Sequence, residues 1–336
     1  MAVNIATMKK KYQNMFFLFG VIVLAVMLTQ LDYNQVWNGL KSAGYWFFAV
    51  VALWAFLYIF NTATWYIIIK SGSEEKTKIN FFWLYKITVS GFALNYTTPC
   101  GLMGGEPYRI MALSPKIGTE RASSSVILYA MTHIFSHFIF WILSILLYLI
   151  TEPLNFLSGI ILALAGAFCV LGVWFFIKGY RKGMAVRLMN FMSHIPGIKK
   201  WAGGFVGKHK EQLDTVDRQI AALHNQNRKS FVSAVLLELA CRFCSAFEIM
   251  FVLLVLSPDV SYAQCVLILA FTSLFANLMF FIPLQLGGRE GGFMMSTAGL
   301  AMSASAGIFV ALIVRIRELI WTAIGLLLIN LEKKKK

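Results

Sequence analysis

Two short glycine-rich stretches interrupt otherwise apolar sequence, and they constrain the fold more than any other feature. The first reads NYTTPCGLMGGEPYR from position 95, and the second reads FFIPLQLGGREGG from position 280. In each, two adjacent glycines lie between a proline and a glutamate that follows the proline by seven residues. The pairs are Pro99 with Glu106 and Pro283 with Glu290. Because proline removes a backbone donor and glycine weakens a helix, both stretches are predicted to be breaks between helical pieces.

The composition indicates an all-α polytopic membrane protein. Apolar residues make up 59% of the 336 residues and charged residues only 13%, whereas soluble domains have about 45–50% and about 25%. A helix needs about 20 apolar residues to span a bilayer. Six segments are predicted full spans: 15–31, 45–69, 123–150, 156–178, 230–257 and 305–330. We expect one membrane domain over residues 1–336, with an uncleaved first span because no small-x-small cleavage site follows it.

The distribution of basic residues predicts the orientation of the chain. With a cytoplasmic N-terminus, 24 of the 30 lysines and arginines fall in cytoplasmic segments, and five arginines lie inside apolar segments. Only Lys41 then lies outside. This positive-inside bias predicts a multi-pass protein with both termini in the cytoplasm. We expect the membrane to be a bacterial-type plasma membrane.

The same bias predicts that the two broken segments each return to the side they came from. Basic loops flank residues 80–113 on both ends, so this segment is expected to be a re-entrant hairpin from the cytoplasmic face. Residues 262–303 follow a loop without basic residues and precede a span that ends inside, so a second hairpin from the outer face is expected. The alternative is two kinked full spans, which makes eight spans in all.

The two halves of the chain match as an inverted repeat. The first repeat covers about 45–150 and the second about 230–330, and the distance from span start to proline is 54 and 53 residues. Paired breaks of this kind point to a transport site. The basic insert at 179–229 is predicted to form amphipathic helices on the cytoplasmic leaflet. No nucleic-acid partner is expected, because the positive-inside bias already accounts for the charge.

Ten ionised side chains fall inside the apolar segments. Each costs roughly 2.5–3.5 kcal/mol at the centre of a spanning helix, so most must pair or face water. They are Glu106, Arg109, Glu238, Arg242, Glu248, Arg289, Glu290, Arg315, Arg317 and Glu318. Their spacing allows Glu238 to pair with Arg242 and Arg315 with Glu318 along one helix, in a structural or a functional role. The four charges on the breaks are predicted to be functional.

The glycine pairs before the glutamates are predicted to open half-helices. These pairs are Gly104 with Gly105 and Gly287 with Gly288. Free N–H groups and the positive dipole end would favour a phosphate or another anion, and Arg109 and Arg289 could add bidentate bonds to it. The glutamates could neutralise these arginines, bind an amine-bearing headgroup or carry a coupling proton.

Two histidines, His133 and His137, lie four residues apart on one predicted helix face. They could bind zinc, line a polar or protonatable cavity, or lie in the core with their hydrogen-bonding groups satisfied. Because no HExxH motif or further ligand cluster accompanies them, no metal or other cofactor is predicted. The candidate cavity or proton-carrying residues are His133, His137, Glu238, Arg242 and Glu318.

The break residues resemble a known family, the transmembrane domain of lysylphosphatidylglycerol synthases. Its first motif is similar to Pro99, Gly105, Glu106 and Arg109, its second to Pro283, Gly287, Gly288 and Glu290, and its late arginine to Arg315. The resemblance implies a flippase-like domain that moves a lipid between leaflets, with these residues at the substrate site. Two features depart from it: Arg289 stands where the family more often has a small or apolar residue, and the sequence ends at Lys336 without the soluble aminoacyl-transferase domain.

Three functions remain open from the sequence. The first is a non-enzymatic transporter of a phospholipid, an aminoacyl-phospholipid or a glycolipid. The second is the membrane component of a phosphatidylglycerol lysyltransferase whose catalytic domain is a separate chain. The third is a transporter of a small anionic solute. The expected partners are anionic or aminoacylated lipids or glycolipids, with a second copy of the chain or a separate transferase as further possibilities.

Overall fold

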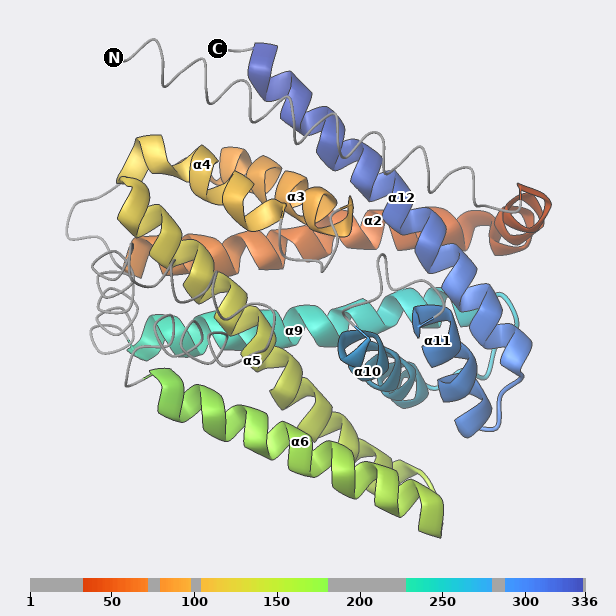
Figure 1. The fold of residues 1–336 in the computed structure, drawn as a ribbon. Helices are drawn as coiled ribbons and strands as arrows, with labels where there is room; N and C mark the ends of the chain where they lie inside the picture. Colours follow the sequence, from red (N-terminus) through yellow and green to blue (C-terminus); the bar gives the residue numbers. More distant parts are fainter. Residues whose placement is uncertain (1–32, 72–78, 98–103, 181–227, 280–287, 335–336) are drawn as a thin grey trace, which may run out of the picture.

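The computed structural model describes residues 33–71, 79–97, 104–180, 228–279 and 288–334, and this part of the chain is helical without strands (Figure 1). The helices are α2 (Tyr33–Ser71), α3 (Phe81–Thr97), α4 (Gly105–Ile117), α5 (Thr119–Thr151), α6 (Phe156–Tyr180), α9 (Arg228–Leu253), α10 (Tyr262–Leu278), α11 (Gly288–Gly299) and α12 (Ala304–Lys334). The prediction of an all-α protein is confirmed for these residues.

Within the described residues, three helical segments are long and apolar enough to cross a membrane. They are Trp37–Ser71, Thr119–Thr151 and Phe156–Ile177, and they correspond to the predicted spans that begin at 45, 123 and 156. The predicted spans 230–257 and 305–330 correspond to α9 and α12, which are 26 and 31 residues long and carry several of the charged side chains. The predicted span 15–31 and nearly all of the basic insert lie outside the described residues.

Both predicted breaks separate a pair of helices that pack against each other. The first pair is α3 and α4, and the second is α10 and α11. The new helix begins at Gly105 in the first pair and at Gly288 in the second, so the prediction that the glycine pairs open helices is confirmed. Pro99, Pro283 and Gly287 lie outside the described residues.

Local sequence explains several helix ends and bends. Ser261 caps α10 in a capping box with Gln264, which satisfies free backbone N–H groups at the helix start. Gly118 separates α4 from α5 and has a positive φ of 82°, a conformation that other residues rarely adopt. Gly44 has φ 51° inside α2 and marks a kink there.

The helices form two groups that share one packing pattern. The first helix group is α2–α5 and the second is α9–α12. Helix α3 packs against α12 as α10 packs against α5, and α4 packs against α5 as α11 packs against α12. Helix α2 contacts α5 as α9 contacts α12. Among the described helices, α6 makes extensive contact only with α5. Exchanging the two groups therefore maps their main contacts onto one another.

The corresponding helices α2 and α9 lie side by side and run antiparallel (Figure 1). Trp46, early in α2, stacks on Phe251, late in α9, with ring centroids 5.4 Å apart. Asn61, late in α2, donates a hydrogen bond of 3.3 Å to Glu238, early in α9. The two groups thus meet along this antiparallel pair.

Close backbone contact joins the groups at the crossing of α3 and α12. A Cβ atom on Gly325 would lie 2.5 Å from Ala93 Cβ and 2.9 Å from the Val89 carbonyl oxygen. Ser90 Oγ donates a hydrogen bond of 3.0 Å to the Gly325 carbonyl. Small residues allow such close approach between membrane helices, so this glycine fixes where α12 crosses the first group.

Candidate functional site

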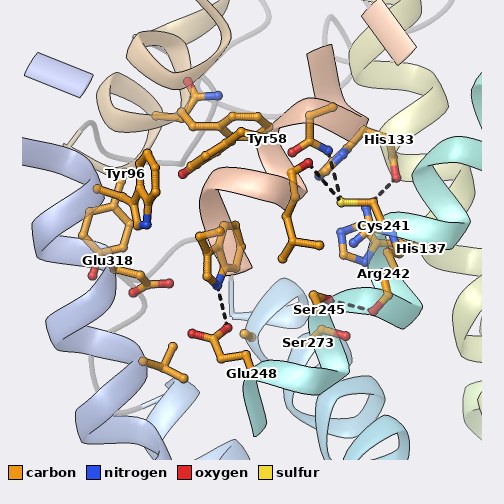
Figure 2. Close-up of a pocket in the computed structure, with 18 of the residues that line it drawn as sticks. Tyr58, Tyr96, His133, His137, Cys241, Arg242, Ser245, Glu248, Ser273 and Glu318 are labelled. Carbon is orange, nitrogen blue, oxygen red and sulfur yellow. Dashed lines mark hydrogen bonds between the residues drawn. The ribbon is translucent and has the colours of Figure 1, made fainter. Parts of the chain in front are cut away.

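A cavity of about 630 Å³ lies between the two helix groups, and all eight of their helices contribute residues to its wall (Figure 2). Eight of the ten ionised residues predicted inside the membrane line it. They are Glu106, Arg109, Glu238, Arg242, Glu248, Arg289, Arg317 and Glu318. The four acidic and four basic side chains have a formal charge of zero, which reduces the cost of keeping them in a membrane interior.

The first break places an ion pair at the start of α4. Arg109 Nη1 lies 3.2 Å from Glu106 Oε1, and Asn95 Nδ2 of α3 donates to the same oxygen at 2.9 Å. Asn95 Oδ1 also accepts a 2.7 Å bond from the backbone N–H of Gly105. Asn95 therefore holds both the first turn of α4 and its glutamate in place.

Three aromatic rings surround the Arg109 guanidinium, which is only 1% exposed. Its central carbon lies 4.6 Å from the ring centroid of Phe92, 5.3 Å from that of Tyr129 and 5.9 Å from that of Trp65. Such cation–π contacts stabilise a cation that has left water. Gly91 makes room for it, because a Cβ there would lie 2.4 Å from Arg109 Nε.

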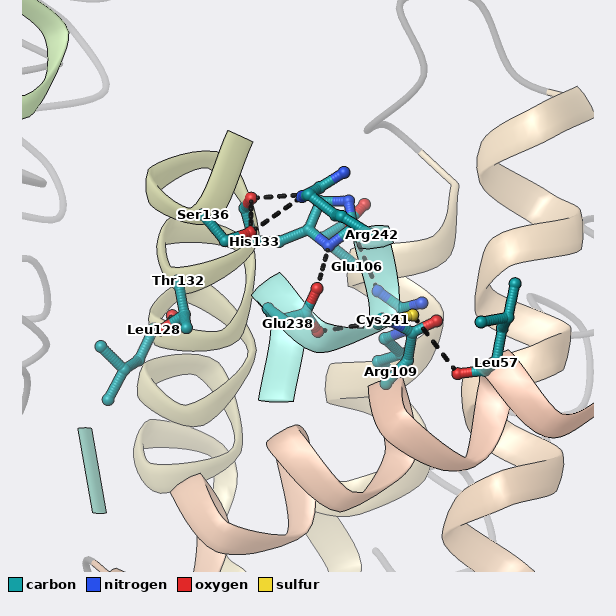
Figure 3. Close-up of polar contacts among 11 residues, drawn as sticks. Leu57, Glu106, Arg109, Leu128, Thr132, His133, Ser136, Glu238, Cys241 and Arg242 are labelled. Carbon is teal, nitrogen blue, oxygen red and sulfur yellow. Dashed lines mark hydrogen bonds and ion pairs between the residues drawn. The ribbon is translucent and has the colours of Figure 1, made fainter. Parts of the chain in front are cut away.

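A second polar cluster joins α5 to α9 (Figure 3). His133 Nδ1 lies 2.8 Å from Glu238 Oε2, and Asn61 Nδ2 donates to Glu238 Oε1 at 3.3 Å. Arg242, one turn further along α9, donates to Ser136 Oγ and to the His133 carbonyl, each at 3.0 Å. His137 packs beside His133, with ring centroids 5.3 Å apart. Both histidines thus lie on the cavity wall.

A third cluster lies on α12. Arg317 makes two hydrogen bonds to Glu248 of α9, at 2.7 and 2.9 Å. Glu318 pairs with Arg289 of α11 and lies 3.7 Å from Arg317. Four charged groups from three helices are therefore connected along one side of the cavity.

Arg315 and Glu290 form an ion pair between α12 and α11. These two predicted site residues are not among the cavity-lining residues of the described helices. Arg315 Nη1 also lies 3.5 Å from the Tyr96 hydroxyl of α3, so the pair connects the second break to the first helix group.

Two predicted pairings within one helix are wrong. Glu238 binds His133 and Asn61 on neighbouring helices, and Arg242 binds α5. Arg315 likewise pairs with Glu290 of α11, and Glu318 pairs with Arg289 of the same helix. Residues three or four apart share a helix face, and that face here meets another helix with a better-placed partner.

Several residues of the site were missed in the sequence analysis. They are Trp54, Tyr58, Asn61, Asn95 and Tyr96. A usable signal was available for the two asparagines, because an amide in an apolar helix needs a hydrogen-bonding partner. Within the described residues, no group of three or more His, Cys, Asp or Glu side chains is arranged to hold a metal ion.

The fold and the cavity define a class, helical membrane proteins with a charged internal site between two related helix groups. The model of one family, the lysylphosphatidylglycerol synthase TM region, matches residues 15–325. The chain therefore belongs to this family. No curated protein and no solved structure matches it.

Proposed function

We propose that this protein is a lipid transporter of the flippase type that catalyses no reaction and moves a lipid headgroup through the cavity between its helix groups. The candidate lipids are phospholipids, aminoacyl-phospholipids and glycolipids. One observation carries the proposal: charged side chains from α4, α9, α11 and α12 face a shared cavity that all eight helices of the two groups line, in a protein of apolar helices. Intramembrane ionisable residues mark substrate pathways in general.

The cavity has the size and chemistry that a headgroup needs. Its volume of about 630 Å³ falls within the roughly 300–1,000 Å³ of typical ligand pockets. Three of its four arginines already pair with glutamates, so a headgroup with its own charges exchanges these internal ion pairs for pairs with itself. Such an exchange keeps the number of unpaired charges low at each step, which lowers the barrier to movement across the membrane.

We further propose six full spans with two re-entrant hairpins, arranged as an inverted repeat. The shared packing pattern and the antiparallel course of α2 and α9 support this topology. Two equivalent helices that pack antiparallel are related by an axis perpendicular to them, which is the arrangement of inverted-repeat transporters. Movement of one helix group against the other then exposes the cavity to each leaflet in turn.

Family membership supports a second function, the membrane component of a phosphatidylglycerol lysyltransferase with its catalytic part on another chain. The anion-solute transporter is the third candidate, because arginines line the cavity. Both make predictions that differ from those of a lipid transporter.

Lipid movement can be tested in reconstituted vesicles. The purified chain is inserted into vesicles that contain fluorescent phosphatidylglycerol, and dithionite is added outside to quench the outer leaflet. We expect more than the outer half of the fluorescence to be lost, whereas protein-free vesicles lose only that half. Uptake of radiolabelled phosphate into the same vesicles, without lipid movement, would favour the solute transporter. Activity that requires an added soluble transferase and lysyl-tRNA would favour the lysyltransferase component.

A further inference from the structure

We propose that Arg242, with His137 beside it, forms the phosphate-binding site of the cavity and takes the phosphodiester of a lipid headgroup. This inference rests on the proposed lipid transport and names the group that the cavity recognises. It differs from the sequence prediction, which placed anion binding at the two breaks. The evidence is the distribution of partners among the arginines of the cavity.

Arg242 differs from the other arginines of the cavity wall in its partners. Arg109, Arg289 and Arg317 each form an ion pair with a glutamate. Arg242 forms none within 4.0 Å in the described part of the chain, and its two hydrogen bonds go to neutral oxygens. A guanidinium with neutral acceptors keeps its full charge available for an anionic ligand.

The nearest carboxylate to Arg242 along its own helix is already engaged. Glu238 lies one turn earlier in α9, but its Oε1 accepts from Asn61 and its Oε2 faces His133 at 2.8 Å. Glu238 therefore affects Arg242 only through electrostatic attraction at a distance, without a direct hydrogen bond. A phosphate would meet the guanidinium without displacing a bound carboxylate.

The geometry of Arg242 leaves part of the guanidinium for a ligand. Its Nε and Nη2 are fixed by Ser136 and the His133 carbonyl of α5, and Nη1 makes no hydrogen bond to the described residues. His137 lies on the same side of the cavity (Figure 2), and its buried Nδ1 has no hydrogen-bond partner in that part of the chain. An imidazole N–H and a guanidinium N–H are the donors that a phosphate oxygen requires.

Charged and titratable groups of three helices surround Arg242. From α9, Glu238 and Cys241 are adjacent, and from α5, His133 and Tyr129 face the same cluster. From α4, Glu106 and Arg109 pair with each other at 3.2 Å and are matched in charge. Arg242 is thus a cation without an ion-paired glutamate in the described helices, whereas Glu106 and Arg109 form a neutral pair.

Binding can be measured on the purified full chain in a non-ionic detergent. Fluorescent phosphatidylglycerol is titrated in one arm, and a diacylglycerol with the same chains and fluorophore, which lacks the phosphate, in the other. We expect Arg242→Gln to weaken phosphatidylglycerol binding about tenfold or more and to leave diacylglycerol binding unchanged. The matched control is Arg121→Gln at the start of α5, outside the cavity, which should change neither. Unaltered phosphatidylglycerol binding by Arg242→Gln overturns the proposal, as does an equal loss of both lipids.

A second variant covers the case in which Arg242→Gln does not fold, as judged by its thermal unfolding. Arg242→Lys keeps the charge but loses the planar fork, so we expect weaker phosphatidylglycerol binding than in the wild type. Wild-type affinity in this variant would overturn the proposal. Inorganic phosphate is added as a competitor to distinguish the sources of the ligand. Displacement of the lipid shows that phosphate alone suffices, and failure to displace it, with binding still dependent on Arg242, shows that the site needs the lipid phosphodiester.

The outcome is separable from that of the vesicle assay. Arg242-dependent lipid binding without movement between leaflets would leave the phosphate site standing and refute the flippase. Lipid movement with unaltered binding in both Arg242 variants would do the reverse.

Discussion

Arg317 of α12 and Glu248 of α9 are held together by two hydrogen bonds, and Trp54 of α2 covers them both. The indole Nε1 donates to Glu248 Oε2 at 2.9 Å, and its ring centroid lies 3.9 Å from the Arg317 guanidinium carbon. Both charged residues are only 4% exposed. The pair lies within the second helix group, where each partner neutralises the other, and Trp54 connects it to the first group at the cavity wall.

Removing one member of this pair should destabilise the protein strongly. Glu248→Ala leaves the Arg317 charge buried with a weak partner, and we expect the free energy of unfolding to fall by about 3–5 kcal/mol. The double variant Glu248→Ala with Arg317→Met should recover part of the loss. Unfolding in detergent micelles measures both, with Glu152→Ala at the half-buried C-cap of α5, which forms no ion pair within the described residues, as control. A loss below about 1 kcal/mol in the single variant, typical of a surface pair, would contradict the buried pairing.

Glycine at the start of α4 should be required for folding. A Cβ on Gly105 would lie 2.2 Å from the Gly91 carbonyl oxygen and 2.6 Å from Asn95 Oδ1. Gly105→Ala should therefore push α4 away from α3 and cost about 1–3 kcal/mol of stability. The control is Gly159→Ala in α6, which meets no atom within 4 Å and should be neutral or slightly stabilising. Equal unfolding midpoints for the two variants would show that α3 and α4 do not pack this closely.

A change at Gly91 should affect transport more than insertion. A methyl group there must displace the Arg109 side chain, which would then leave its aromatic surroundings and Glu106. We expect Gly91→Ala to reduce lipid movement in vesicles by tenfold or more, roughly the effect of losing a charge-assisted hydrogen bond. Gly166→Ala, whose nearest atom lies at 3.9 Å, is the matched control. The interpretation fails if Gly91→Ala moves lipid at the control rate.

The sequence predicted the elements of the fold better than their contacts. Proline and glycine act locally, so the helix starts at Gly105 and Gly288 follow from them directly. The apolar runs likewise located α5 and α6, because the length of a spanning helix is set by the bilayer. Such features require no knowledge of neighbouring helices.

The partners of the charged residues could not be predicted from spacing. Spacing finds partners within one helix, but Glu238 and Arg315 bind residues on other helices. Which helix faces which depends on the rotation of each helix about its axis, and the packing of the whole bundle fixes that rotation. The aromatic surroundings of Arg109 have the same origin, since they come from three different helices.

The proposed inverted topology makes a prediction about accessibility. Thr119, the first residue of α5, and Ser303, just before α12, are both exposed and occupy matching places in the two helix groups. Cysteines introduced at these two positions should react with a membrane-impermeant maleimide from opposite sides, Thr119→Cys from the cytoplasm and Ser303→Cys from outside. Reaction of both from one side would mean that the groups are not inverted.

Lipid movement by variants of the two breaks tests the central claim most directly. Arg109→Ala and Glu290→Ala each remove one member of an ion pair, one on the cavity wall and one at the second break. In the dithionite assay, with equal amounts of inserted protein in each set of vesicles, we expect the wild type to expose the inner-leaflet phosphatidylglycerol to quenching. Both variants should behave like protein-free vesicles. Movement at the wild-type rate in both variants would show that these residues hold the fold and do not handle the lipid.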